Sequence, residues 1–285
     1  MGKGKEKDYF RERRRTLRRT RWSERMARTM QYALIAEAFL IPLVPLAAMA
    51  VLLVGCGALC VRLRIDPTFH LRRLPYDAPA LLFVVIAFLS VAVAPNMAFS
   101  FYNYSHLVPI YALTYLLTGQ TLRSAEDLRP LVISMAAAAF LVILYGFYQF
   151  IFGIDISAMK WVDGASFPEL SKRVFSTWEN PNILAGYLDI VVCLALGLAA
   201  ALPGWRRGLA LVLLVMALAC LGMTYARGAC LVIGILLAGY GVLRDWRVLL
   251  GIVVVGAGVL FFDPVLSDRL LSVFTRVDTS SEMRL

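Results

Sequence analysis

The pentapeptide IPLVP, residues 41–45, interrupts the first long apolar run of the sequence, which covers residues 33–61. Pro42 and Pro45 favour a turn here, because proline lacks the backbone N–H that a helix interior requires. The run is therefore either one long helix or a hairpin of two helices. If the chain crosses a membrane, this choice inverts the side on which every later connection lies.

Composition indicates that the chain does cross a membrane. Hydrophobic residues make up 60% of the sequence and charged residues 17%, whereas soluble domains have about half and about a quarter. Further apolar runs follow the first, separated by short polar connections. They cover residues 78–94, 104–117, 131–152, 182–202, 209–224, 229–243 and 246–262. The pattern predicts an all-α, polytopic helical membrane bundle.

The distribution of arginine favours the hairpin. With a hairpin, the connections on the side of the N-terminus hold about ten arginines in roughly 39 residues. The opposite connections hold about seven basic residues in roughly 65. Basic connections face the cytoplasm, so we predict about nine membrane segments and a cytoplasmic N-terminus. A single first helix is the alternative, and it would place the arginine-rich connections outside.

Most of the net charge of +10 lies at the start of the chain. Residues 1–29 carry twelve Lys or Arg and four acids, which gives +8. This segment is interpreted as a basic cytoplasmic tail, followed by a bundle over residues 30–262 and the start of an external loop over 263–285. The tail sets the topology or lies on anionic membrane lipids; nucleic acid is a less favoured partner and is not expected.

One polar stretch stands at the mouth of a predicted helix: RVFSTWENPNILAGYLD, residues 173–189. Asn180 is a good N-cap and Pro181 suits the first helical position. On the predicted topology, Arg173, Asn180, Asn182 and Arg227 face the exterior at this level. The arginines either anchor to headgroups or, with the helix N-terminus, bind an anion such as phosphate.

Two acids lie inside apolar runs, where ionisable groups usually face a bundle interior. Asp189 lies two turns beyond Asn182 on the same helix face, so it either lines a cavity below the mouth or bonds to a neighbouring helix. Glu37, near the inner end of the first run, is expected to reach the headgroups. The five cysteines fall in apolar runs without accompanying ligands, so no metal or cofactor is expected. His106 has no neighbour in sequence that would orient it as a base.

The motif RVFSTWENPNILAGYL, followed by LGMTYARGACL at residues 221–231, resembles the O-antigen ligase and polymerase superfamily of bacterial membrane proteins. GFYQFIFG and WVDGASFPELSKRVFS make the resemblance closest to the branch once labelled as bicarbonate transporters. It covers approximately residues 62–285. In the second motif Thr224, Arg227 and Gly228 match the family pattern, whereas Ala226 replaces a serine.

The resemblance implies a membrane glycosyltransferase, a ligase or polymerase of cell-envelope polysaccharide biosynthesis in the bacterial inner membrane. Such an enzyme moves a sugar chain from a polyprenyl diphosphate-linked glycan to a hydroxyl of a lipid or glycan acceptor on the outer side. It implies catalytic roles for Arg227 and Arg284. The expected substrate-binding residues are Arg173, Asn180, Asn182, Thr224 and Asp189.

The resemblance also places the general-base histidine of the family beyond residue 285, in the external loop. The sequence is therefore expected to be the first part of a longer protein or a truncated product. Two alternatives stay open: an anion (bicarbonate) uptake transporter or its accessory, and a noncatalytic membrane partner.

Overall fold

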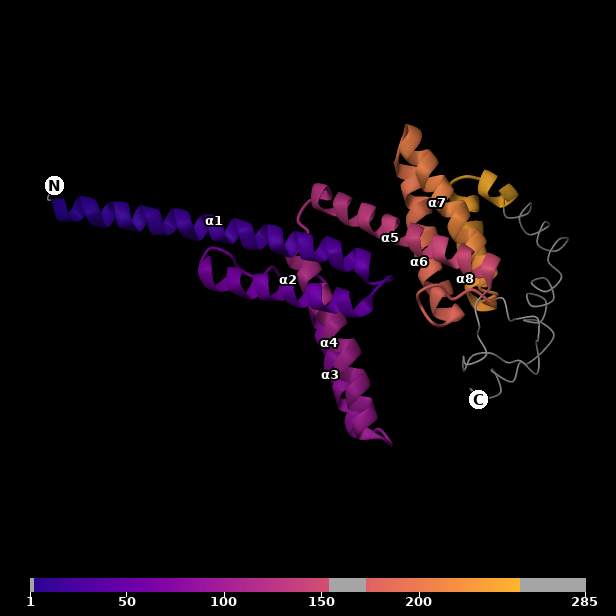
Figure 1. Ribbon diagram of the computed structural model, residues 1–285, viewed down its shortest axis with the longest axis horizontal. Coiled ribbons are helices and arrows are strands. Elements are labelled where there is room, and N and C mark those ends of the chain that lie inside the picture. Colours follow the sequence, from indigo (N-terminus) through magenta and orange to yellow (C-terminus); the bar gives the residue numbers. More distant parts are fainter. Residues whose placement is uncertain (1–2, 154–172, 252–285) are drawn as a thin grey trace. The chain divides into compact units, whose positions relative to one another are not determined.

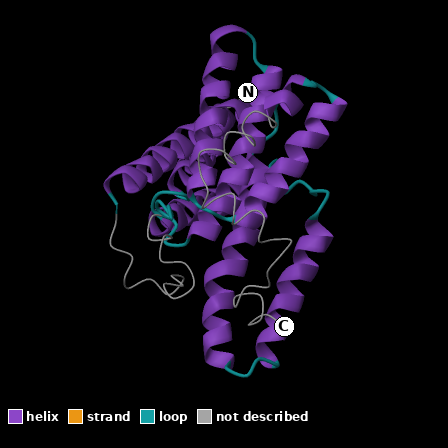
Figure 2. Cartoon of the chain, turned by 90° about the vertical axis from the view of Figure 1, so that its right-hand side faces the viewer, coloured by secondary structure: helices purple, strands orange, loops and turns teal. Residues whose placement is uncertain are grey.

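The computed structural model describes residues 3–153 and 173–251, of which residues 3–18 are described by their backbone alone. Within these ranges the chain is helical and contains no strand (Figures 1 and 2). The predicted all-α fold class is confirmed for this part of the chain. The helices group into two compact units, and the division between them falls between Ala138 and Ala139.

The predicted apolar run 33–61 is divided between two helices, and each of the other runs that lie wholly within the described ranges falls on one helix. Unit 1 contains α1 (Lys3–Leu40), α2 (Pro45–Ile65), α3 (Asp77–Ala92), α4 (Met97–Thr121) and the first half of α5 (Ala125–Phe152). Unit 2 contains the second half of α5, α6 (Pro181–Ala201), α7 (Gly204–Met223) and α8 (Arg227–Leu243).

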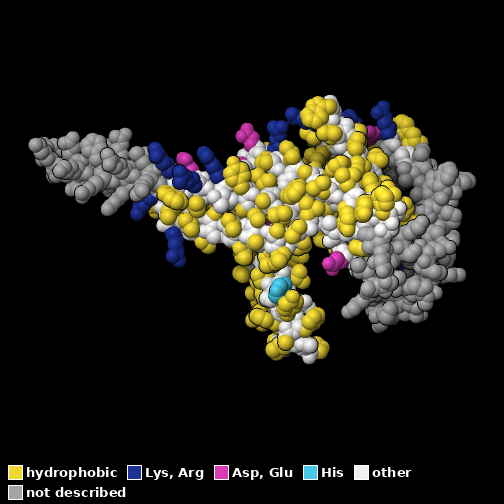
Figure 3. Space-filling view, viewed as in Figure 1, with side chains coloured by type: hydrophobic (Ala, Val, Ile, Leu, Met, Phe, Trp, Pro, Cys, Tyr) yellow, Lys and Arg dark blue, Asp and Glu magenta, His cyan; other side chains and the backbone are white. Residues whose placement is uncertain are grey.

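Four of these helices are long and apolar enough to cross a membrane: α2, α5, α6 and α7. The 21 residues of α2 and of α6 span roughly 31 Å, which matches a hydrocarbon core of about 30 Å. The apolar helices α3 and α8 are shorter. Hydrophobic side chains also cover much of the visible surface over these elements (Figure 3). Such a surface is unfavourable in water, so the helices indicate a membrane protein.

The hairpin predicted at IPLVP is present. Helix α1 ends at Leu40 and α2 begins at Pro45, with a turn in which the Val44 N–H donates to the Leu40 carbonyl at 2.7 Å. The two helices then pack side by side (Figure 1). At their far ends, Ser23 of α1 donates a hydrogen bond to Asp66, just after α2. The helices are therefore antiparallel over most of α2.

The basic segment is not separate from this hairpin. Helix α1 continues without a break across the predicted boundary between residues 29 and 30. Met30 is fully buried, and Met26 packs against the same cluster. The last part of the segment interpreted as a tail therefore packs with this hairpin, through Met26.

The expectation for Glu37 is wrong. Its side chain is only 2% exposed, and its Oε1 accepts a hydrogen bond from the Thr114 hydroxyl of α4 at 2.5 Å. Because α1 extends far to the N-terminal side of the apolar run, Glu37 lies beside the hairpin turn and not at the inner end of a helix. It cannot reach the headgroups while α4 covers it.

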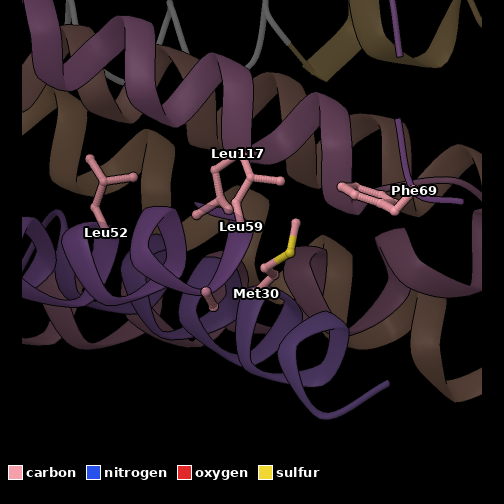
Figure 4. Packing of buried hydrophobic residues seen from close by; sticks show 6 residues of the cluster. Met30, Leu52, Leu59, Phe69 and Leu117 are labelled. Atoms are coloured by element: carbon pink, nitrogen blue, oxygen red, sulfur yellow. The ribbon is translucent and has the colours of Figure 1, made fainter. Parts of the chain in front are cut away.

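The core of unit 1 joins α1, α2 and α4 with the connection after α2. Its buried members are Met30, Leu52, Ala58, Leu59, Phe69 and Leu117 (Figure 4). The close approach of the helices depends on Gly55 of α2. A Cβ at this position would lie 2.6 Å from Leu117 Cδ2 and 3.0 Å from Ala33 Cβ.

Unit 2 is built around α6. Its buried residues recur at helical spacing and form one continuous face: Pro181, Leu184, Ala185, Leu188, Val191, Val192, Ala195 and Ala199. This face packs along α7 and also contacts α8. The packing fixes the direction of α6 and, with it, the position of its N-terminus.

Replacement of Gly55 by alanine is expected to lower the free energy of unfolding by roughly 1–3 kcal/mol, because the added methyl overpacks a filled site. Gly57 of the same helix has open space around its Cα, so Gly57→Ala is the matched control. It should leave stability unchanged or raise it by less than about 1 kcal/mol. Thermal unfolding in detergent measures both; equal effects of the two changes would contradict the packing described.

Candidate functional site

A buried glutamine organises the segment that precedes α6. Gln149 of α5 is 5% exposed. Its Oε1 accepts hydrogen bonds from the backbone N–H groups of Phe175 and Ser176, at 3.2 and 2.7 Å. Its Nε2 donates to the Ser176 carbonyl at 3.1 Å. One side-chain amide thereby satisfies three backbone groups that burial removes from water.

The same segment is bonded to the end of α7. The Val174 N–H donates to the Met223 carbonyl at 3.1 Å, and Val174 is 1% exposed. Beside it, Arg173 donates from Nε to the Thr224 carbonyl at 2.9 Å. Residues far apart in sequence, 173–176 and 223–224, therefore lie together at one end of unit 2.

Arg173 also reaches the start of α6. Its terminal guanidinium nitrogen donates to Asn182 Oδ1 at 3.0 Å. Asn180 is the N-cap, as predicted, and its Oδ1 accepts from the Asn182 N–H at 2.8 Å, with Pro181 at the first helical position. The structure thus brings Arg173, Asn180 and Asn182 together through direct hydrogen bonds.

Thr224 closes the turn between α7 and α8. It is fully buried, its hydroxyl donates to the Leu221 carbonyl at 2.7 Å, and its Oγ1 accepts from the Ala226 N–H at 3.2 Å. Within this geometry the hydroxyl shapes the turn. Arg227 follows as the first residue of α8 and is half-buried. Ala226, where the family pattern has serine, is the N-cap and supplies no side-chain cap.

The backbone is strained in these two segments. Among the described residues, the positive φ angles outside glycine belong to Ser176 (50°), Glu179 (56°) and Tyr225 (52°). Such conformations cost about 1–3 kcal/mol each and cluster at functional sites. Ser176 is held in place by Gln149 and by its own hydroxyl, which donates to the Val142 carbonyl at 2.7 Å. The strain marks this end of unit 2 as a candidate site.

Asp189 lies on α6, two turns beyond Asn182. Its Oδ1 is buried and has no hydrogen-bond partner among the described residues. The position is consistent with either predicted role, a cavity wall or a contact to a neighbouring helix.

The remaining predicted residues lie elsewhere. Arg284 and the motif WVDGASFPEL fall outside the described residues. His106 belongs to unit 1, where its Nδ1 is 2.8 Å from the Tyr102 carbonyl oxygen. No cluster of three or more potential metal ligands occurs in residues 3–153 and 173–251.

The interpretation of the sequence did not assign a role to Gln149 or Ser176. The available signal was a polar Gln149 within the otherwise apolar GFYQFIFG, because a buried amide in an apolar helix usually has a specific partner. Nothing in the spacing identified that partner as the backbone of residues 175 and 176.

Comparisons with protein-family models, with curated proteins and with solved structures find no match to this chain.

Replacement of Gln149 by methionine, which has a similar shape, is expected to lower the free energy of unfolding by about 3 kcal/mol. The change leaves buried backbone N–H groups of residues 175 and 176 without an acceptor. Ile151→Met is the matched control, because Ile151 lies on the same helix and is 70% exposed; its effect should stay below about 0.5 kcal/mol. A Gln149→Met protein as stable as the parent in thermal unfolding would show that Gln149 does not hold this segment.

Proposed function

We propose that the chain forms about nine membrane segments. Its N-terminus lies in the cytoplasm, and the N-terminal ends of α6 and α8 lie on the outer side. The described connections support this orientation. On it, the inner connections carry Arg72, Arg73, Arg123, Arg244 and Arg247. Among described residues of the outer connections and adjoining helix starts, the basic ones are Arg173 and Arg227. Basic residues favour the cytoplasmic side. Topology alone therefore does not explain two arginines at one outer site.

The proposed function is glycan transfer, of the kind performed by the O-antigen ligase and polymerase superfamily in the bacterial inner membrane. The observation that carries it is the pair of hydrogen bonds from Arg173 to Thr224 and Asn182. These bonds hold a guanidinium between the N-terminus of α6 and the turn that leads to Arg227. Helix N-termini and guanidinium groups together are a typical arrangement for binding phosphate.

The chemistry of glycan transfer explains why positive charge is needed at this site. The bond between the sugar and the diphosphate carrier breaks, and the acceptor hydroxyl oxygen forms the new bond to the same carbon. The diphosphate leaves with both bonding electrons, so negative charge grows on its oxygens. Fixed cationic donors stabilise that charge in the transition state. Arg227, Arg173 and the α6 N-terminus are proposed to fill this role, with Arg284 as a second catalytic arginine.

The other predicted residues support this arrangement. Asn180 and Asn182 hold the start of α6, and Thr224 shapes the turn before Arg227. Asp189, farther along α6, is proposed to contact the glycan. The proton of the acceptor hydroxyl is expected to pass to a general base, as in the family that the sequence resembles.

Binding of an undecaprenyl diphosphate sugar tests this proposal. Arg227→Ala is expected to weaken binding tenfold or more, equivalent to about 1.4 kcal/mol. Arg244 is the matched control, because it follows the opposite end of α8 and is exposed. Arg244→Ala should bind as tightly as the parent. The titration uses purified protein in nanodiscs.

Three results would contradict the proposal. Equal binding by the parent and Arg227→Ala would make Arg227 a headgroup anchor. Equal weakening in Arg227→Ala and Arg244→Ala would show general electrostatic attraction in place of a site. Failure of the parent protein to bind any polyprenyl diphosphate would favour the transporter or the noncatalytic partner.

A further inference from the structure

A second group of arginines lies in unit 1, around one aromatic ring. The guanidinium carbon of Arg62, in the last turn of α2, is 4.0 Å from the centroid of the Phe69 ring. That of Arg123, just after α4, is 5.5 Å from the same centroid. Phe69 is 7% exposed and belongs to the core of unit 1 (Figure 4). A fixed ring therefore attracts two cations from separate segments.

The connection that carries Phe69 is itself tied to α4. Gln120 is 2% exposed, and its side-chain amide both accepts from the Arg72 N–H and donates to the Arg72 carbonyl, each at 2.8 Å. The Arg72 guanidinium donates to the carbonyls of Gly119 and Leu122, at 2.7 and 3.2 Å. These bonds tie the backbone that follows the ring to the end of α4, which Arg123 follows.

Asp66, the acid nearest Arg62, is engaged elsewhere. It accepts hydrogen bonds from the Ser23 hydroxyl at 2.5 Å and from the Thr68 hydroxyl and N–H at 2.6 and 3.1 Å. These bonds lower the pKa of Asp66 to about 2, so it is ionised near neutral pH. Arg62 bonds to the Ser23 hydroxyl at 3.3 Å, and Asp66 attracts it without a direct contact.

The acid nearest Arg123 is also engaged. Asp127 accepts from the N–H groups of Arg123 and Ser124 and from the Ser124 hydroxyl, all at 3.0–3.1 Å, at the start of α5. The described contacts of the two guanidinium groups are thus with Ser23 and the Phe69 ring. The two guanidinium groups carry like charges beside one ring, so they repel each other. An anion between them would relieve that repulsion.

We propose that Arg62 and Arg123, positioned by Phe69, bind the phosphate of an anionic phospholipid headgroup. Arg62 lies at the end of α2, one of the helices long enough to cross a membrane, where headgroups are found, and Arg123 lies by the same ring. Two guanidinium forks match phosphate oxygens. A lipid is favoured over a free anion because Val54 and Val61, two turns apart on α2, are exposed and give its acyl chain an apolar surface.

Native mass spectrometry of the whole chain in detergent, titrated with dioleoyl phosphatidylglycerol, tests the proposal. Arg123→Gln is expected to weaken lipid binding about fivefold, and the double change of Arg62 and Arg123 to glutamine should weaken it further. Arg123 is exposed, so the single variant should fold, which thermal unfolding checks. Arg129→Gln is the matched control: an exposed arginine nearby, with the same change of charge and about the parent's affinity expected.

Two further measurements distinguish a specific lipid site from general electrostatic attraction. Dioleoyl phosphatidylcholine should bind the parent more weakly than phosphatidylglycerol and should not distinguish the variants. Inorganic phosphate in about tenfold excess should not displace the lipid. Equal binding by parent and Arg123→Gln, an equal loss in Arg129→Gln, or displacement by inorganic phosphate would each overturn the proposal.

Discussion

The hydrogen bonds between the Gln149 side chain and the backbone of residues 175 and 176 are the constraint on which the candidate site depends. A connection at the end of a helical bundle has no regular partners for its N–H and carbonyl groups. Inside a membrane protein such groups must be satisfied by protein or water. Gln149 supplies three of these bonds from within a helix. With the segment held, Arg173 extends to Thr224 and Asn182, and the starts of α6 and α8 are linked.

Arginine has two different roles in this chain. On the proposed topology it is frequent at the inner ends of the helices, where positive charge favours the cytoplasmic side. At the proposed outer end, the described part of the chain has Arg173 and Arg227, and Arg173 is fixed by a backbone carbonyl and an asparagine. A guanidinium fixed in position by hydrogen bonds is a preorganised donor for a phosphate. The same reasoning applies to Arg62 and Arg123, which are held by an aromatic ring and a hydroxyl.

The sequence was sufficient for the local features of the fold. Apolar runs predicted the helices, Pro42 and Pro45 predicted the hairpin, and Asn180 with Pro181 predicted the start of α6, because each depends on neighbouring residues. Features that depend on distant partners were not predicted. The burial of Glu37 requires α4, whose Thr114 lies far along the chain. The role of Gln149 likewise requires a segment more than twenty residues away. The functional role of Arg227 remains a prediction from resemblance and placement.

The central claim is that Arg173 and Arg227 act on one anion. A double-mutant cycle with Arg173→Ala, Arg227→Ala and the double variant, read out as binding of an undecaprenyl diphosphate sugar, tests it most directly. Groups that contact the same ligand are coupled, so the two effects should depart from additivity by about 0.5 kcal/mol or more. Strictly additive effects, or no effect of either substitution, would contradict a shared diphosphate site.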